Sequence, residues 1–307
     1  MQTILGSTGV IGNELAKALS VYTNKIRLVS RNPKQVNGND ELLPADLTDK
    51  EQTLNSVKGS EIVYLTVGLE YDINVWRSKW PIVMHNVIDA CKKHNSKLVF
   101  FDNVYSYGKV NGWMKEQSPL NPSSEKGKVR KQISEMILEE IEKGNLKAII
   151  ARAADFYGPK APSFVNVMIF ENFKKGKRAM WLVNDKVKHS FTYTPDAGKA
   201  TAILGNTEDA YNQIWHLPTD INALTGKEIT ELCAKDFGAE SKYIVLPKWM
   251  LKIIGLFNKT IKENNEMLYQ YDSDYLFDST KFEKRFNFKP TSYTDGIKET
   301  MKFMKAN

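Results

Sequence analysis

The feature that most constrains the fold is a loop with regularly spaced glycines near the beginning of the chain. Gly6, Gly9 and Gly12 follow a short apolar segment at residues 3–5 and lead into an amphipathic segment at residues 11–19. This order is typical of a strand, a tight turn and a helix. Each glycine then has its own use: the turn, close approach of the backbone to a ligand, and close packing of helix on strand. The loop therefore predicts the first unit of a parallel α/β sheet.

Short apolar segments alternate with helical patterns along the first half of the chain, up to about Tyr157. The further expected strands are residues 26–29, 61–67, 98–101 and 148–151. The further expected helices are residues 49–57, 81–94 and 129–141, with a final one at 295–305. Alternation of this kind favours βαβ units. We predict an α/β fold with a Rossmann-type doubly wound parallel sheet, made of residues 1–158 and return strands within 188–218. A smaller C-terminal α/β substrate lobe is expected at residues 159–187 and 219–307.

The composition excludes several classes of protein. Of the 307 residues, 42% are hydrophobic and 26% are charged, as in an ordinary globular protein. The net charge of +7 comes from lysines spread along the chain, which indicates a solvated surface rather than a nucleic-acid partner. Cys91, Cys233 and the four histidines lack the spacing of metal ligands, so no metal is expected. With no apolar run long enough to span a bilayer and no signal-like start, we expect a cytoplasmic protein without a membrane partner.

The glycine loop is suited to the pyrophosphate of a dinucleotide. A helix that starts directly after the loop offers free backbone N–H groups and the positive end of its dipole. The strand–turn–helix context disfavours the alternative of a purely structural glycine turn. The expected cofactor contacts in this loop are Gly6, Thr8, Gly9, Val10, Ile11 and Gly12.

The end of the second expected strand indicates which dinucleotide is bound. NAD-binding loops usually place a carboxylate there to hold the ribose hydroxyls, and this chain instead has Ser30, Arg31 and Asn32. Arg31 could make bidentate hydrogen bonds to a 2′-phosphate, with Asn32 as a further donor; the alternative is a solvated surface arginine. We therefore expect NADP(H) to be preferred over NAD(H). Asp46, followed by Leu47, could accept from the adenine amino group or cap the next helix.

Several segments in the correct order resemble the short-chain dehydrogenase/reductase superfamily, in its extended or atypical branch of NAD-dependent epimerases and dehydratases. They are residues 6–12, 45–47, 65–68, 105–108, 152–159, 190–197, 277–281 and 288–291. The resemblance implies that two further segments run beside the cofactor and its nicotinamide. The residues it implies are Leu65, Thr66, Val67, Ala153, Ala154, Asp155 and Phe156.

The chain departs from this family at the catalytic residues. The family's usual mechanism uses a tyrosine as acid/base, a lysine four residues later that holds the ribose, and a serine or threonine on the substrate oxygen. By alignment, Lys126 stands at the position of the tyrosine, Arg130 at that of the lysine and Asn103 at that of the serine. All three usual residues are therefore absent.

Other groups could supply the missing chemistry. Lys126 could act as a general acid if it is desolvated, whereas Arg130 could hold ribose or pyrophosphate oxygens but does not titrate near neutral pH. Tyr105, Tyr107 and Tyr157 are further proton-donor candidates, although each could equally be a packed aromatic. Asn103 could orient the substrate.

Two classes of function remain open at this point. The first is an NADP(H)-dependent oxidoreductase, or an isomerase-type epimerase/dehydratase, with a rearranged acid/base and a small carbonyl or sugar-nucleotide-like substrate. The second is a catalytically silent NADP(H)-binding redox sensor or regulatory protein. Fold resemblance alone does not decide between them, nor does it decide whether the chain forms a homodimer.

Overall fold

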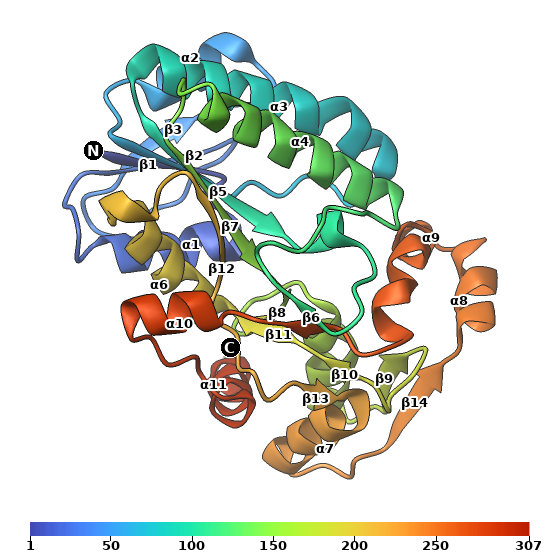
Figure 1. The fold of residues 1–307 in the computed structure, drawn as a ribbon. Coiled ribbons are helices and arrows are strands. Elements are labelled where there is room, and N and C mark those ends of the chain that lie inside the picture. The colour runs from blue at the N-terminus through green and yellow to red at the C-terminus, as the bar shows by residue number, and fades with distance from the viewer. Residues whose placement is uncertain (307) are drawn as a thin grey trace. The chain divides into compact units, whose positions relative to one another are not determined.

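The structure, a computed structural model, describes residues 1–306 and divides into two compact units (Figure 1). Unit 1 consists of residues 1–106, 126–153 and 195–217, and unit 2 of residues 107–125, 154–194 and the part from 218 onward. By packing, residues 107–125, 154–158 and 188–194 fall in unit 2, whereas the sequence boundaries group most of them with the dinucleotide-binding part.

Unit 1 is built on a seven-stranded parallel sheet with strand order β12-β7-β5-β4-β1-β2-β3. Its strands are β1 (Gln2–Leu5), β2 (Ile26–Ser30), β3 (Glu41–Pro44), β4 (Ile62–Leu65), β5 (Lys97–Asn103), β7 (Ala148–Ala153) and β12 (Gln213–His216). β1 pairs with β2 on one side and with β4 on the other, so the strand order reverses there. In open α/β sheets, ligands bind outside the carboxyl ends of the strands at such a reversal. The predicted doubly wound fold is confirmed.

Helices cover both faces of this sheet (Figure 1). They are α1 (Val10–Leu19) and α6 (Thr194–Gly205) on one face, and α2 (Lys50–Val57), α3 (Ile73–His94) and α4 (Glu125–Glu142) on the other. Successive side chains of a strand point to opposite faces. Accordingly, Val63 and Leu65 join the apolar core under α3, while Tyr64 lies against Gly205 of α6.

Helix α3 is longer than the sequence pattern predicts. We expect it to start at Pro81, but it begins at Ile73, and the Asp72 side chain accepts hydrogen bonds from two N–H groups of its first turn. Pro81 then lies inside the helix, which costs about 3 kcal/mol. The extra turns bury Trp76 and Trp80, and burial of large aromatic side chains offsets this cost.

The segment at residues 190–197 is also different from the expectation. It does not extend the main sheet as a return strand; it forms β11 (Phe191–Tyr193), pairs with β8 (Asp155–Tyr157) and then starts α6. β12 is the strand that returns to the main sheet, where it pairs with β7. Because β8 and β11 pair only with each other, they belong to unit 2.

Unit 2 combines short strand pairs with helices around its own apolar core, which includes Trp181 and Phe170. Its other strands are β6 (Trp113–Met114), β9 (Ala179–Leu182), β10 (Lys188–His189), β13 (Leu224–Thr225), β14 (Tyr243–Leu246) and β15 (Leu276–Phe277). Its helices are α5 (Glu171–Lys174), α7 (Gly226–Phe237), α8 (Lys248–Gly255), α9 (Lys259–Asn264), α10 (Thr280–Phe286) and α11 (Tyr293–Ala306). The final helix predicted at 295–305 is confirmed by α11.

Candidate dinucleotide site

The outer two glycines of the loop are required by the protein's own packing. Gly6 has φ +98°, and a Cβ there would lie 2.5 Å from backbone atoms of Val67. A Cβ on Gly12 would lie 2.6 Å from the carbonyl oxygen of Gly6. Real Cβ atoms do not come this close to backbone. These two positions therefore hold the turn tightly against β1 and the segment after β4.

The middle glycine is different, because nothing in the protein requires it. Gly9 is exposed, has an ordinary φ of −68°, and a Cβ there would meet only the Gly6 carbonyl oxygen at 3.5 Å and that of Thr66 at 4.0 Å. Gly9 is also the N-cap of α1, which has no side-chain cap and no acidic residue in its first turn. The N–H groups and positive dipole end of α1 thus remain available to an anion. An open glycine at such a helix start fits a diphosphate.

The end of β2 carries unengaged polar groups beside this loop. Arg31 and Asn32 are exposed, and among residues 1–306 no hydrogen bond or ion pair engages the Arg31 side chain. The Oγ of Ser30 is buried and has no hydrogen-bond partner there. β1 and β2 are register neighbours up to Leu5 and Val29, so these groups lie at the same carboxyl edge as the glycine loop.

Asp46, at the end of β3, is engaged in a local turn. Its Oδ1 accepts from the backbone N and the Oγ1 of Thr48, at 2.9 and 2.8 Å. These hydrogen bonds, followed by the charges of Lys79 and Arg31, lower the pKa of Asp46 below its usual value. The cap of α2 is Asp49, whose Oδ1 accepts from the N–H of Gln52 at 2.9 Å. The negative charge of Asp46 thus stays close to Arg31.

A buried charge network lies under the carboxyl end of the sheet. Asp102 of β5 accepts from Nε and Nη2 of Arg130 at 2.8 and 2.5 Å, and from Nε of Arg152 at 3.0 Å. Ser134 donates to the same carboxylate at 3.1 Å. Asp102 and Arg152 are register partners on β5 and β7, which places their side chains side by side.

Arg130 lies in the protein interior, where this network holds its guanidinium. Its guanidinium lies 4.6 Å from the Trp80 ring and 4.9 Å from the Phe100 ring, and its side chain is 5% exposed. Burial raises the pKa of Asp102, but Arg130 and then Arg152 outweigh that effect and hold it below its usual range. Because two donors of Arg130 are directed at Asp102, the geometry favours a structural role over the predicted contact with ribose or pyrophosphate.

Lys126, one turn earlier on α4, has an aromatic environment. The residue is fully buried, and its Nζ lies 4.6 Å from the centroid of the Tyr71 ring. Tyr71 is edge-on to Trp76 at 5.6 Å, and Trp76 stacks on Tyr105 at 6.4 Å. Tyr71 and Trp76 are not among the site residues expected from the sequence. The signal that could have found Tyr71 is its place a few residues after the segment at 65–68, on a loop at the carboxyl end of β4.

The remaining predicted residues of unit 1 mostly support the backbone around this edge. Leu65 and Thr66 are buried, Val67 is half-buried, and Thr66 Oγ1 donates to the Leu5 carbonyl oxygen at 3.2 Å. Asn103 is half-buried, and its Oδ1 accepts from the N–H of Tyr105 at 3.1 Å. Thr8 is exposed on the glycine loop, and Val10, Ile11, Leu47 and Ala153 range from half-buried to buried.

The predicted residues of unit 2 lie largely in its interior. Tyr107 and Tyr157 are both buried, and Tyr157 packs between Tyr193 and Tyr293 at 5.3 and 5.7 Å. A Cβ on Gly296 would lie only 2.2 Å from the Tyr157 hydroxyl, so this ring is tightly packed. This matches the alternative of a packed aromatic. Three cofactor candidates, Ala154, Asp155 and Phe156, also lie in this unit.

Two of these three have polar contacts within unit 2. The N–H of Ala154 donates to Thr192 Oγ1 at 3.0 Å, and Asp155 Oδ2 lies 3.0 Å from Nε2 of the buried His189. These contacts fix the path of the chain directly after β7.

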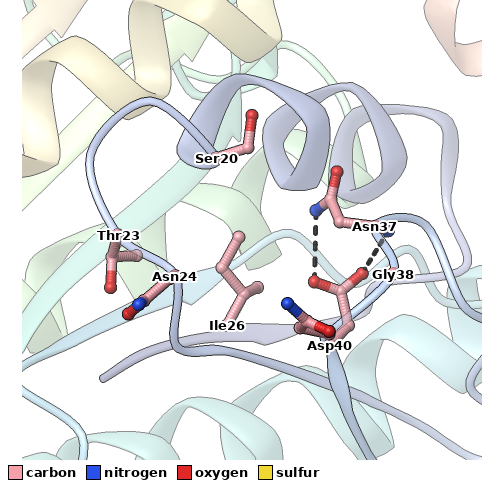
Figure 2. A pocket seen from close by; sticks show the side chains of 8 residues that line it. Ser20, Thr23, Asn24, Ile26, Asn37, Gly38 and Asp40 are labelled. Carbon is pink, nitrogen blue, oxygen red and sulfur yellow. Dashed lines mark hydrogen bonds between the residues drawn. The ribbon is translucent and has the colours of Figure 1, made fainter.

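A hollow elsewhere in unit 1 is not the dinucleotide site. It measures about 180 Å³ and is lined by residues around Ile26, at the amino end of β2, and by the turn at residues 37–40 (Figure 2). Asp40 fills part of this turn by accepting from the N–H and the side-chain amide of Asn37 at 2.6 and 3.1 Å. The glycine loop and Arg31 follow the carboxyl ends of the strands, whereas the hollow lies at their amino ends.

A family model matches more than half of the chain. The model named NAD dependent epimerase/dehydratase family matches residues 3–216. A curated relative, 3beta-hydroxysteroid-dehydrogenase/decarboxylase isoform 2 of Arabidopsis thaliana, is 21% identical over 295 residues. That alignment covers 86% of this chain and 52% of the relative, so the chain spans about half the length of the curated relative it matches.

Solved structures agree with the fold over nearly the full chain. UDP-N-acetylglucosamine 4-epimerase from Bacillus cereus is 19% identical with a TM-score of 0.77, and 99% of each chain is covered. UDP-glucose 4-epimerase from Thermus thermophilus, in complex with NAD, is 16% identical with a TM-score of 0.80, again over 99% of each chain. Across residues 1–306 no helix has the length and apolarity needed to cross a membrane, and no cluster of metal-ligating side chains is found.

Proposed function

Since the chain belongs to the NAD-dependent epimerase/dehydratase family, we propose that it is an NADP(H)-dependent oxidoreductase or epimerase/dehydratase-like enzyme. The observation that carries this proposal is the open Gly9 at the uncapped start of α1, where the strand order reverses. A nicotinamide cofactor held there would supply hydride transfer. We propose a small carbonyl or sugar-nucleotide-like substrate, because the relatives are named as a hydroxysteroid dehydrogenase and as UDP-sugar epimerases.

The experiment that tests this proposal separates binding from turnover. NADPH and NADH are titrated calorimetrically into the protein. Turnover is then followed as NADPH oxidation with a panel of small ketones, and by analysis of the products with a panel of sugar nucleotides, because epimerisation and dehydration return the hydride and leave no net oxidation of the cofactor. Tight binding together with turnover of one substrate class is expected. Binding without turnover across the panel would instead favour the redox sensor, and no dinucleotide binding at all would refute both.

The preference for NADP(H) rests on the groups at the end of β2. Arg31 is exposed and unengaged, the Ser30 hydroxyl is buried without a partner, and no carboxylate follows β2 directly. A ribose 2′-phosphate would satisfy both side chains, whereas a ribose hydroxyl pair would find no carboxylate directly after β2. The main opposing feature is the nearby Asp46.

Replacing Arg31 with alanine is expected to weaken NADPH binding by roughly tenfold or more and to leave NADH binding nearly unchanged. A charge-assisted contact to phosphate contributes about 1.5–3 kcal/mol, and only NADPH makes it. Calorimetric titration of both cofactors measures the difference. Lys34→Ala removes an exposed positive charge three residues later and serves as the control. Equal affinities of the native protein for the two cofactors would refute the preference.

For the proton donor, we propose the pair formed by Tyr71 and Lys126. The pair brings a phenol on the loop after β4 next to an ammonium on α4. By alignment, this ammonium belongs to the residue that stands at the position of the family's usual tyrosine. The Lys126 ammonium lies over the Tyr71 ring in a buried position, so a positive charge is held beside this phenol. Tyr105 is the second phenol in this aromatic group, while Tyr107 and Tyr157 are buried within unit 2.

Tyr71→Phe is expected to reduce turnover by about 10²–10⁴-fold, the usual contribution of a general acid, with little change in cofactor affinity. The variant keeps the ring beside Lys126 and removes only the hydroxyl. Lys126→Met should lower turnover as well, because the phenol loses its neighbouring charge. Tyr22→Phe, at an exposed tyrosine outside this group, is the control. If Tyr105→Phe abolishes turnover while Tyr71→Phe does not, Tyr105 is the donor and the assignment of Tyr71 is wrong.

A further inference from the structure

One surface of unit 2 exposes large apolar side chains that its core does not use. Trp249 and Ile253 of α8 are 62% and 51% exposed, and Leu256 and Phe257 directly after the helix are 77% and 89% exposed. Twelve large hydrophobic residues are exposed among residues 1–306, and five of them lie between residues 244 and 257. Single exposed apolar residues need no explanation, but a cluster of this kind marks an interaction surface.

The helical geometry places Trp249 and Ile253, at i and i+4, on one face of α8. Leu256 and Phe257 follow directly after the last helical residue, Gly255, and the four side chains together are called the apolar stripe. The opposite side carries the buried Leu251 and Gly255, and a Cβ on Gly255 would lie 2.6 Å from the side-chain amide nitrogen of Asn265. α8 is therefore fixed by its inner side and lies beside α9 (Figure 1), while the side chains of the apolar stripe are exposed.

The charged residues of the segment that carries this stripe are all basic, with acidic residues directly outside it at Glu240 and Glu263. Residues 242–262 contain five lysines and no aspartate or glutamate. Lys242 pairs with Glu240 and Lys248 with Asp272. Lys252 and Lys262 are exposed and form no ion pair among residues 1–306. An apolar stripe bordered by lysines, with an exposed tryptophan, is complementary to the interface of a bilayer that carries anionic lipids.

From this complementarity we propose that α8 and residues 256–257 dock unit 2 onto an anionic membrane surface. The apolar side chains enter the headgroup region, and the lysines meet lipid phosphates. A helix that lies in the interface needs no spanning length, so the lack of a spanning helix does not oppose this docking. A second copy of the chain fits less well, because a two-fold contact over this stripe would bring the same lysines together.

The test is co-sedimentation of the full chain with vesicles of phosphatidylcholine alone and of equimolar phosphatidylcholine and phosphatidylglycerol. Binding is expected to the anionic vesicles only, and to fall as salt is raised. Leu256→Ser with Phe257→Ser should lower the partition coefficient by at least about tenfold. Lys252→Glu with Lys262→Glu should lower it comparably. Both pairs are exposed, so circular dichroism should show an unchanged fold.

The control variant is Val21→Ser, which removes an exposed apolar side chain from unit 1 and should bind vesicles normally. Equal binding to neutral and anionic vesicles, or unchanged binding of the Leu256/Phe257 variant, would overturn the proposal. So would self-association in light scattering that disappears in that variant while vesicle binding is absent, since the occupant would then be a second copy. Neither result depends on cofactor binding or turnover.

Discussion

Replacement of Asp102 by alanine is expected to lower the free energy of unfolding by about 3–5 kcal/mol. The variant leaves Arg130 and Arg152, both almost fully buried, without the carboxylate to which they donate. Breaking a buried ion pair by removing one partner leaves an uncompensated charge in a medium of low dielectric constant. Urea denaturation of the native protein and the variant, followed by circular dichroism, measures the difference.

The same network makes a prediction about pH. The pKa of Asp102 is held below its usual value of 3.8, mainly by Arg130 and Arg152 acting against burial. A carboxylate with a lowered folded-state pKa stabilises the protein above its unfolded-state pKa, and this stabilisation is lost as the pH falls through the lowered value. The native protein should therefore lose stability in acid more steeply than Asp102→Asn.

Arg130 provides the matched control. The double variant Asp102→Ala with Arg130→Met removes one of the two orphaned charges and should be more stable than Asp102→Ala alone. An Asp102→Ala loss below about 1 kcal/mol, within the range of ordinary surface substitutions, would show that the network is not strongly coupled.

Gly9→Val is expected to weaken the affinity for the dinucleotide by about 100-fold or more, while the protein stays folded. The backbone at Gly9 has an ordinary φ, and a Cβ there meets no atom closer than 3.5 Å, so a side chain fits the free protein. The same side chain would occupy the space in which a pyrophosphate approaches the start of α1. Calorimetric titration with NADPH, alongside thermal unfolding, separates the two effects.

Substitutions at two other glycines serve as comparisons for this result. Gly38→Val adds a side chain where nothing lies within 4 Å, and it should keep both the fold and the binding. Gly6→Val should lose the fold, because Gly6 has a left-handed φ of +98° and its Cβ would clash with Val67. Unchanged NADPH affinity in Gly9→Val would place the cofactor outside this loop.

The sequence by itself determined the α/β class, the parallel sheet and the position of the glycine loop. These follow from local patterns, since apolar segments of strand length, helical periodicity and glycine spacing are all read within a few residues. It also placed Arg31 at the end of the second strand, and in the structure β2 ends at Ser30, directly before it. The prediction for the start of α3 is wrong, because proline is normally found in the first turn of a helix and local rules therefore place Pro81 as its first residue.

Only the tertiary structure decided which partners the residues at the family's catalytic positions contact. By sequence, Lys126 and Arg130 are one turn apart and can point the same way, but in the structure Arg130 hydrogen-bonds Asp102 of β5 and Lys126 lies over the ring of Tyr71. These partners are 28 and 55 residues away in the chain, positions that no local pattern relates. Asp102 and Arg152 meet because β5 and β7 are adjacent in register, and burial makes their charges dependent on each other. Strand order and burial are properties of the assembled sheet, and for that reason the sequence alone left the acid/base open.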